Sequence, residues 1–438
     1  MSKRHWAAHN LAARLLAGPW TRPDIAAGIK SVLGPAHPAS RRALATRLAA
    51  FGGETPPAPR ILAAYLRGSA FFLTPRDHAA PAILESPLFA PIAAFANLPI
   101  PPLATPGDLA SWLNLTPAQL GWLSDTRRAH TRATGAKLQH YHYALIPKPS
   151  GKRRLLEAPK PRLKTIQRRI LHEILNHVPV HQAAHGYVPG RSCLTGAQIH
   201  ASEDMLATFD LAQFFPAIAL PRIHGLFRAL GYPWEVARHL AGLCTTATPA
   251  AIRQRLPDPH QRSLHAIPHL PQGAPTSPAL ANLLAFTLDL RLHGLARRIG
   301  ANYTRYADDL AFSGPAQTLK HLPTTLKTIL QDEGFALNPA KTRLMPRNAS
   351  QRVTGIIVNE HCNIPRKKYD TLKATIHNCL RSGPASQNRA AHPNFRAHLE
   401  GRITWVEQIN PPRAAKLRAI FEQIDWAPPA TNPDAETG

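Results

Sequence analysis

The stretch Asn302-Tyr-Thr-Arg-Tyr-Ala-Asp-Asp-Leu-Ala-Phe-Ser-Gly314 carries the strongest structural signal in this 438-residue chain. Its side chains alternate as in an extended strand, and two adjacent acids interrupt the run. The alternating residues are Tyr306, Leu310 and Phe312 in one set and Arg305 and Ala311 in the other. We predict a β-hairpin with Asp308 and Asp309 at its tip. Because aspartate favours turns for local reasons, a solvated turn is the alternative interpretation.

A third acid follows an apolar strand further upstream. The segment Met205-Leu-Ala-Thr-Phe-Asp-Leu-Ala-Gln-Phe-Phe-Pro216 predicts a strand that ends on Asp210. Carboxylates held together repel one another, so such a group needs positive charge beside it. Acid oxygens suit hard divalent cations, and a pair of such ions supports in-line phosphoryl transfer. Asp210, Asp308 and Asp309 are therefore the predicted catalytic residues and metal ligands, with two Mg²⁺ per active site.

The composition is strongly basic. The chain has 52 Lys plus Arg against 26 Asp plus Glu, a formal charge of +26. This excess favours a polyanionic partner, because each neutralised phosphate releases counterions. Ribosomal and membrane-surface proteins share the property, so charge alone identifies no partner. The four cysteines are widely spaced and indicate neither a disulfide framework nor a zinc site.

Neither a leader peptide nor a membrane span is predicted. The start, Met-Ser-Lys-Arg-His-Trp, leads into Ala-rich sequence that contains arginine rather than into a continuous apolar core. The uncharged run Ser86–Thr105 is long enough to raise the question of a span, but its five prolines would repeatedly break a helix. We expect a soluble cytoplasmic protein with no membrane partner.

Residues 1–104 form an Ala-, Arg- and Pro-rich extension with no catalytic constellation. Helical patches near 7–17, 40–50 and 60–67 are separated by Gly- and Pro-rich sequence. We predict small helices on a partly flexible arm.

Residues 105–135 are predicted to hold a short helical pair. Thr105 and Thr116 each precede a proline at the first helical position, so both are predicted N-caps. The pair is either a packing element or a helix-turn-helix that reads duplex DNA. Its second helix lacks the basic face that DNA reading requires.

Three motifs together resemble those of bacterial retron reverse transcriptases. They are the Tyr-Ala-Asp-Asp box that ends at Asp309, the string Leu-Pro-Gln-Gly-x-x-x-Ser-Pro that ends at Pro278, and Val353-Thr-Gly355. The resemblance runs from about Tyr141 to Asn359. It implies an α+β right-hand polymerase fold in which an antiparallel sheet and helices form the palm. The implied domains are fingers at 136–200, palm at 201–359, a helical thumb at 360–426 and a disordered tail at 427–438.

In the fingers, residues 141–159 predict a hairpin that carries four cations, Lys148, Lys152, Arg153 and Arg154. These cations either grip an incoming triphosphate or protect a solvated edge strand. The pattern Arg154-x-Leu-x-x-Pro159 is similar to the first block of the family, which implies that Arg154 contacts the nucleotide. Lys152 is assigned to nucleic-acid binding.

Two further segments of the fingers are predicted to meet nucleic acid. Apolar residues from Leu163 to Val178 fall on one helical face, which leaves Lys164 and Arg168 outside to track phosphates. A glycine-punctuated loop, similar to the second block of the family, places Arg191 beside a helix start as a phosphate or template contact. A solvated arginine is the alternative there.

In the palm, the resemblance implies that the Leu211 carbonyl is a further metal ligand and that Phe215 lies under the sugar of the incoming nucleotide. Gln272 and Gly273 predict a turn whose backbone approaches that nucleotide closely. Ser277 and Pro278 are expected to cap and start an apolar helix that continues to Leu292. Residues 334–343 resemble the block after the catalytic box. Within it, Lys341 is the candidate to neutralise and protonate the pyrophosphate, with a solvated lysine as the alternative.

The last part of the chain is predicted to be mostly helical. Residues 352–359 are expected to form a strand, followed by helices at about 366–381, 394–409 and 412–424. The basic residues of this module suit phosphate contacts along a template–primer duplex. The assigned contacts are Arg366, Lys367, Lys368 and Arg402.

The resemblance implies an RNA-directed DNA polymerase that uses dNTPs. It further implies that the enzyme copies part of its own structured non-coding RNA, primes from a guanosine 2′-hydroxyl and makes branched single-stranded DNA in antiphage defence with an effector protein. No RNase H domain is expected after the thumb, so a host RNase H would remove the template. The alternatives are an intron-like or abortive-infection reverse transcriptase and a catalytically idle RNA-binding module.

Overall fold

The computed structural model describes residues 8, 11–12, 14–16, 19–33, 38–69, 88–126, 139–147 and 153–426. The chain divides into two compact units, residues 1–126 with 224–241 and residues 127–223 with 242–438. The predicted palm range is not continuous in this division, because 224–241 group with the amino-terminal residues. In the described ranges, no helix combines the length and the apolar character needed to cross a bilayer.

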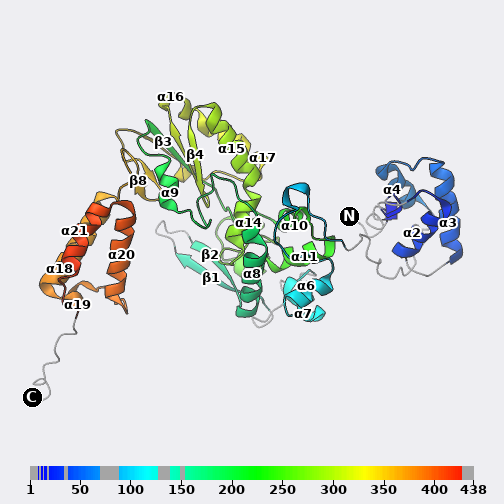
Figure 1. Cartoon of the computed structure of the whole chain (residues 1–438), viewed down its shortest axis with the longest axis horizontal. Helices are drawn as coiled ribbons and strands as arrows, with labels where there is room; N and C mark the ends of the chain where they lie inside the picture. The colour runs from blue at the N-terminus through cyan, green and yellow to red at the C-terminus, as the bar shows by residue number, and fades with distance from the viewer. Residues whose placement is uncertain are drawn as a thin grey trace, which may run out of the picture. The chain divides into compact units, whose positions relative to one another are not determined.

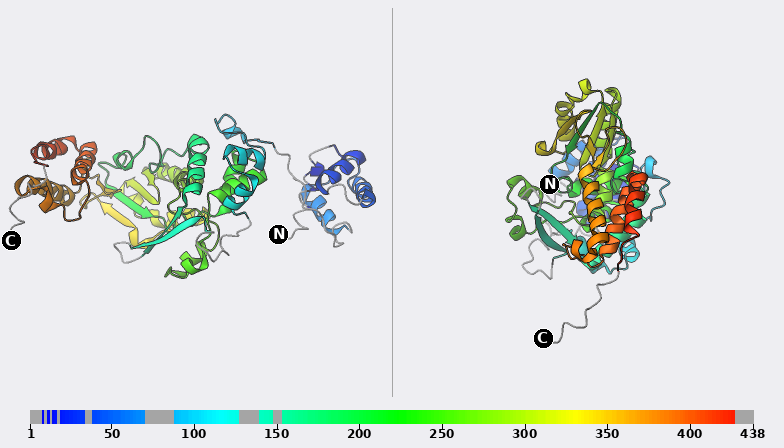
Figure 2. Two further views of the ribbon diagram at one scale, coloured as in Figure 1. Left: turned by 90° about the horizontal axis from the view of Figure 1, so that it is seen from below. Right: turned by 90° about the vertical axis from the view of Figure 1, so that its left-hand side faces the viewer.

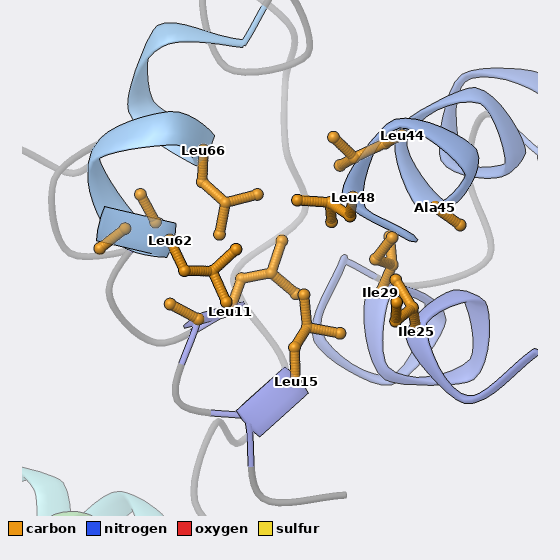
Figure 3. Packing of buried hydrophobic residues seen from close by; sticks show 12 residues of the cluster. Leu11, Leu15, Ile25, Ile29, Leu44, Ala45, Leu48, Leu62 and Leu66 are labelled. Carbon is orange, nitrogen blue, oxygen red and sulfur yellow. The ribbon is translucent and has the colours of Figure 1, made fainter. Parts of the chain in front are cut away.

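The amino-terminal helices share one hydrophobic core (Figure 3). They include α2 (Arg22–Leu33), α3 (Pro38–Gly52) and α4 (Pro59–Gly68). Pairs of buried residues at i, i+4 spacing build this core, namely Leu11 and Leu15, Ile25 and Ile29, Leu44 and Leu48, and Leu62 and Leu66. The predicted helices near 40–50 and 60–67 are confirmed as α3 and α4, and they pack on a shared core. The sequence prediction missed α2, in which Gly28 allows close approach of Leu15.

The other elements of this unit are η1 (Ala93–Phe95), α6 (Pro106–Trp112), α7 (Pro117–Ser124) and parts of α10 (Leu220–Ala229) and α11 (Trp234–Leu243). Both predicted N-caps are confirmed, because the Thr105 and Thr116 side chains each complete a capping box. The Ser124 hydroxyl of α7 lies 2.7 Å from Nδ1 of His239 in α11. This contact supports the packing interpretation of the helical pair, of which residues 127–135 lie outside the described ranges.

A four-stranded antiparallel sheet forms the centre of the second unit (Figure 1). Its strands are β3 (Met205–Asp210), β4 (Asn302–Tyr306), β5 (Asp309–Gly314) and β6 (Arg343–Pro346), in the order β4-β5-β3-β6. The predicted hairpin is confirmed as β4 and β5, and the predicted strand that ends on Asp210 is confirmed as β3.

The two faces of this sheet have different roles. Phe209, Tyr303 and Phe312 pack together on one face, where the Tyr303 hydroxyl donates to Asp289 of α15 (Phe286–Arg298). Asp210 and Asp309 are direct partners on the opposite face. The predicted alternation placed Arg305 apart from Leu310 and is corrected here: the chain reverses between them, so they pair across the hairpin on one face.

The other elements before the last helices surround the sheet or lead to it. They are β1 (Tyr141–Pro147), β2 (Arg153–Pro159), α8 (Pro161–Glu173), η4 (Leu175–His177), α9 (Cys193–Gln198), α12 (Ala250–Arg253), α13 (Pro259–Leu264), α14 (Ser277–Leu284), α16 (Ala316–Leu319), α17 (Leu322–Asp332) and η5 (Pro339–Lys341). Strands β1 and β2 confirm the predicted hairpin of the fingers.

Two helix predictions need correction. The helix that starts at Pro161 ends at Glu173 and continues only as the 3-10 turn η4, so it does not reach Val178. The predicted helix from Ser277 to Leu292 is broken between α14 and α15. Ser277 is its first residue rather than its cap, since the hydroxyl donates to the Pro271 carbonyl at 2.7 Å.

Residues 352–359 form a tight hairpin rather than one strand. Strand β7 (Arg352–Val353) pairs with β8 (Ile356–Ile357) across a two-residue turn. The turn residues Thr354 and Gly355 have φ values of 47° and 87°, the left-handed conformation that such hairpin turns require.

The final helices pack side by side around their own core (Figures 1 and 2). They are α18 (Arg366–Ser382), α19 (Pro384–Gln387), α20 (Phe395–Ile409) and α21 (Pro411–Phe421). The three predicted helices are confirmed within three residues of their ends, and α19 is additional. Leu399, Ile403 and Val406 of α20 are buried in this core. The predicted tail, 427–438, lies outside the described ranges.

Candidate active site

Three carboxylates converge at one end of the four-stranded sheet. Asp210 ends β3 and lies directly opposite Asp309, the first residue of β5, in the antiparallel register. The Leu211 amide donates to the Asp308 carbonyl at 2.9 Å, which fixes the main chain after β3 against the hairpin. Directly opposed residues of such a pair have Cβ atoms about 5 Å apart. The structure therefore brings the three predicted acids together.

Two side chains from the segment before β6 hold the buried acid of this group. Asp210, 4% exposed, contacts the Lys341 ammonium through Oδ1 and accepts from the Asn338 amide through Oδ2 at 3.0 Å. The Asn338 main-chain N–H also donates to the Asp210 carbonyl at 2.8 Å. Lys341 is thus an ion-pair partner and not merely a solvated turn residue. Its ammonium supplies positive charge beside Asp210.

The charged forms of the other two acids, Asp308 and Asp309, are disfavoured by their surroundings. Burial, followed by the charge of Asp210, raises the pKa of Asp308 above its usual value. Burial and the charges of Asp308 and Asp210 raise the pKa of Asp309 to about 6. The single Lys341 ammonium does not balance the negative charge of three neighbouring carboxylates. The group would therefore gain stability from further positive charge.

The donor set suits hard cations. The carboxylates of Asp210, Asp308 and Asp309 offer only oxygen atoms, which Mg²⁺ prefers, and the Leu211 carbonyl belongs to the same main-chain turn. Bound divalent ions would relieve the repulsion among these carboxylates, which adds to burial in raising the pKa of Asp309. The chemistry of these donors therefore suits divalent cations.

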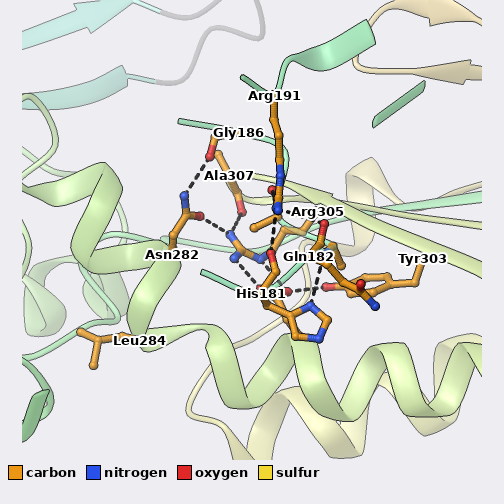
Figure 4. Close-up of polar contacts among 12 residues, drawn as sticks. His181, Gln182, Gly186, Arg191, Asn282, Leu284, Tyr303, Arg305 and Ala307 are labelled. Atoms are coloured by element: carbon orange, nitrogen blue, oxygen red, sulfur yellow. Dashed lines mark hydrogen bonds and ion pairs between the residues drawn. The ribbon is translucent and has the colours of Figure 1, made fainter. Parts of the chain in front are cut away.

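A buried ion pair of Arg305 stabilises the β4–β5 hairpin on the face opposite Asp210 and Asp309 (Figure 4). The Arg305 guanidinium is fully buried and donates to both oxygens of Asp289, at 2.8 and 2.6 Å. The same guanidinium donates to the Asn282 side chain and to the Ala307 carbonyl in the turn. Ala307 has a φ of 56°, so the turn that presents Asp308 depends on this support.

His200, which lies just after α9, connects both strands of the hairpin. Its Nδ1 lies 2.8 Å from the Ser313 hydroxyl and its Nε2 lies 2.7 Å from the Thr304 hydroxyl. Complete burial lowers the pKa of this histidine to about 3, so the ring is neutral at physiological pH. His200 fixes the spacing of β4 and β5 without adding charge near the acids.

A pocket of about 970 Å³ opens on the acidic face of the sheet. Its lining includes Asp309 and Lys341 together with the turn residues Thr354 and Gly355. Arg343 and Arg352 add positive charge. This surface is large enough for a nucleic-acid end that approaches the three acids.

A smaller pocket of about 370 Å³ lies between the β1–β2 hairpin and the predicted nucleotide turn. Arg154 and Gln272 line it from opposite elements, and Arg154 contributes favourable charge at Asp308. Gly273 has a φ of 125° and confirms the predicted sharp turn. Phe215 is half-buried, whereas Phe214 is the core residue and packs on Phe335 at 5.5 Å between ring centroids.

The predicted nucleic-acid contacts fall into three groups. Lys164 and Arg168 are exposed on the outer face of α8, and Lys152 lies outside the described residues. Arg191 donates through Nη1 to three carbonyls, of His181, Gln182 and Ala184 (Figure 4), so much of its hydrogen-bonding capacity holds its own loop. The other four, Arg366, Lys367, Lys368 and Arg402, line one pocket of about 690 Å³ together with Arg352 and Arg413.

The sequence analysis missed several residues that build this site. Asn338 carried no signal beyond its position before Pro339. Arg305 was predicted only as a strand residue, and His200 carried no signal that it would join the two strands of the hairpin. A buried cluster of Glu157, His265 and His269 also escaped notice, because Glu157 lies far in the sequence from the two histidines.

Comparison with known proteins identifies the class. The family described as reverse transcriptase (RNA-dependent DNA polymerase) matches residues 146–358. This range contains the three acids, the nucleotide turn and the β1–β2 hairpin except its first residues. The chain is therefore an RNA-directed DNA polymerase with the right-hand α+β fold.

Individual relatives show to which group of reverse transcriptases the chain belongs. The retron Mx65 reverse transcriptase of Myxococcus xanthus is 40% identical over 330 residues, which cover 74% of this chain and 73% of that protein. The retron Mx162 enzyme of the same organism is 35% identical over 336 residues, 72% of this chain and 65% of that protein. The retron Ec86 enzyme of Escherichia coli is 32% identical over 281 residues, which cover 63% of this chain and 78% of that protein. The chain belongs to the retron reverse transcriptases.

Proposed function

We propose that this reverse transcriptase extends a primer at Asp210, Asp308 and Asp309 with two bound Mg²⁺. The direct pairing of Asp210 with Asp309 across β3 and β5 is the observation that carries this proposal. Bound Mg²⁺ would act as a Lewis acid on the reacting phosphate oxygens. The Leu211 carbonyl is a further ligand candidate in the same turn.

The surrounding residues orient the nucleotide. Arg154 faces the acids from the fingers and would bind the triphosphate, while the Gln272–Gly273 turn forms the opposite wall. Half-buried Phe215 would lie under the sugar. The raised pKa of Lys341 keeps its ammonium charged, because its hydrogen bond to Asp210 and the three acidic charges outweigh burial. That ammonium would stabilise and protonate the departing pyrophosphate.

Basic residues on separate elements would hold the nucleic acid through phosphates. We assign this role to Lys152, Lys164, Arg168, Arg191, Arg366, Lys367, Lys368 and Arg402. The clustering of the last four in one pocket supports their assignment to the duplex.

Incorporation of dNTPs on an RNA template tests the active site. Asp308→Ala should reduce the rate by several orders of magnitude, since the metal site loses one of its acids. Asp204→Ala, at an exposed aspartate just before β3, is the matched control and should retain activity. Equal activity of wild type and Asp308→Ala would contradict the assignment.

We further propose that the template and primer belong to the enzyme's own structured non-coding RNA. The names of the curated relatives support this proposal. Synthesis would start from a guanosine 2′-hydroxyl and yield branched single-stranded DNA. An effector protein in antiphage defence and a host RNase H that removes template RNA are the further expected partners.

Nucleic acid that copurifies with the protein distinguishes the alternatives. A short DNA joined to RNA through a 2′–5′ linkage supports the retron function. Linear or protein-linked DNA would instead favour an intron-like or abortive-infection enzyme. Recovery of RNA alone, together with no dNTP incorporation by wild type, would favour an idle RNA-binding module.

A further inference from the structure

A closed polar network lies buried between β2 and the segment that leads to the nucleotide turn. Glu157 Oε2 is 2.8 Å from His269 Nε2, and Glu157 Oε1 accepts from the Thr248 hydroxyl at 2.6 Å. The Thr248 hydroxyl also lies 3.1 Å from His265 Nδ1. Glu157, His265 and His269 are at most 2% exposed. None of these groups takes part in the chemistry proposed above.

The hydrogen-bond partners define the protonation of His269. Its Nδ1 lies 2.8 Å from the Ile267 carbonyl, which only accepts, so this nitrogen carries a hydrogen. Its Nε2 faces the Glu157 carboxylate. Burial alone would raise the pKa of Glu157, but the charge of His269, its hydrogen bond at 2.8 Å and the nearby His265 hold that pKa at about 2. The network therefore contains a carboxylate and an imidazolium.

A proton explains this geometry better than a metal ion does. The ligand atoms of Glu157, His265 and His269 lie within 4.8 Å of one another, as in a metal site. However, two tetrahedral zinc ligands with bonds of about 2.0–2.1 Å are roughly 3.3 Å apart, which exceeds the 2.8 Å between Glu157 and His269. The two atoms are at hydrogen-bond distance.

Glu157 holds both ends of the segment from His269 to Gly273. Its side chain binds His269, and its main-chain N–H donates to the Gln272 carbonyl at 2.9 Å. A Cβ built on Gly273 would lie only 3.4 Å from the Glu157 carbonyl oxygen. On the other side, the His269 backbone exchanges hydrogen bonds with Thr246 at 3.0 and 3.1 Å. The pair thus joins the fingers strand to the palm.

The joined elements are the two walls of the smaller pocket. Arg153 and Arg154 come from β2, Gln272 comes from the turn, and His265 of the network also lines the pocket of about 370 Å³. We propose that the Glu157–His269 pair positions the Gln272–Gly273 turn against the fingers arginines and thereby sets the affinity for the incoming nucleoside triphosphate. Glu157 and His269 are positioning residues, and the inference rests on the proposed function.

Steady-state kinetics of Glu157→Gln and His269→Gln test this role. Both changes keep side-chain size and one hydrogen bond but remove the ion pair. We expect KM for dNTP to rise about tenfold, the effect of losing a buried charge-assisted hydrogen bond, with kcat and primer–template Kd nearly unchanged. The double variant should show no larger rise, since each single change disrupts the same pair.

Ser124→Ala is the matched control, because it removes a buried hydroxyl–histidine hydrogen bond away from this pocket. It should leave KM for dNTP unchanged. Unchanged KM in the Glu157 and His269 variants would overturn the inference. Parallel losses of kcat, duplex affinity and thermal stability would also overturn it, because they indicate a general structural role. Stoichiometric bound metal that the variants lose would show a metal site instead.

A binding measurement separates this inference from the polymerase proposal. The Kd of a dNTP for the enzyme–primer–template complex is measured in Ca²⁺, which does not depend on turnover. A wild type that incorporates no nucleotide contradicts the proposed function. Equal dNTP Kd values for wild type, Glu157→Gln and His269→Gln contradict the positioning role, and about tenfold weaker binding by both variants supports it.

Discussion

At the residue scale, we propose two tasks for Lys341. Its ammonium pairs with Asp210, and we expect the same ammonium to meet the pyrophosphate as that group leaves. An ammonium can act by charge alone or also by donating a proton. Lysine and arginine differ in this respect, because the guanidinium does not deprotonate in proteins.

Substitution of Lys341 distinguishes charge from proton donation. We expect Lys341→Met to lower kcat by about 10²–10⁴-fold, the usual contribution of a general acid. Lys341→Arg should recover little activity if the proton matters and most of it if charge suffices. Single-turnover incorporation measures both. A kcat of Lys341→Met within a factor of about two of wild type would exclude both tasks.

His200 gives the hairpin a predictable pH response. Burial lowers its pKa to about 3, below the unfolded-state value near 6.5. The unfolded chain therefore binds the extra proton between these pH values. The contribution of His200 to stability is complete above pH 6.5 and falls as pH drops towards 3, by at most about 1.4 kcal/mol per pH unit.

His200→Gln tests this response, since glutamine can bond to Ser313 and Thr304 but does not titrate. Thermal unfolding at pH 7 and pH 5 should show a larger drop in Tm for wild type than for the variant. Identical pH dependence of the two proteins would mean that His200 does not titrate on unfolding.

At the scale of elements, the β4–β5 hairpin depends on α15. Arg305→Met would leave Asp289 as an uncompensated buried charge, and breaking a buried pair in this way costs about 3–5 kcal/mol. The double change Arg305→Met with Asp289→Asn removes that charge and should recover part of the loss. Chemical denaturation measures both. A double variant less stable than Arg305→Met would contradict the buried-charge explanation.

The β7–β8 turn contains a strained residue. Thr354 is β-branched and has a φ of 47°, a conformation that asparagine adopts more easily. Thr354→Asn should therefore stabilise the protein by about 0.5–1 kcal/mol. Thr354 lines the large pocket near Asp309, and its hydroxyl donates to the Cys193 carbonyl at 3.4 Å, so a loss of primer extension in this more stable variant would indicate a functional role of the threonine side chain. A Thr354→Asn variant that is less stable than wild type would contradict the backbone strain at this residue.

Short-range patterns predicted the elements of the site well. The alternation around Asp308, the threonine–proline caps and the helix periodicities of the last helices required only local information. The turn at Thr354 was missed because a β-branched residue rarely adopts positive φ. Arg305 and Glu157 were missed because a buried charge is stable only with a distant partner, here Asp289 and His269. Local sequence patterns do not identify such distant partners.

At the scale of the whole molecule, excess positive charge should govern nucleic-acid affinity. The pocket with Arg366, Lys367, Lys368 and Arg402 offers several phosphate contacts. Each lost contact should reduce the slope of log K against log salt by about 0.7–0.9. We expect this reduction for Arg402→Ala in duplex binding measured over a salt series.

Lys30→Ala is the charge-matched control, because Lys30 is an exposed cation of α2 in the other unit. It should leave the slope unchanged. Equal slopes for Arg402→Ala and Lys30→Ala would mean that net charge, and not this pocket, determines binding.

The count of metal ions at the acids tests the central claim most directly. Mn²⁺ can replace Mg²⁺ as an oxygen-bound ion, and electron paramagnetic resonance reports both the number of bound ions and their magnetic coupling. With primer, template and dNTP bound, the account predicts two coupled Mn²⁺ ions per wild-type chain, and loss of this coupled pair in Asp210→Asn but not in Asp204→Asn. Uncoupled ions in wild type, or a coupled pair that persists in Asp210→Asn, would contradict it.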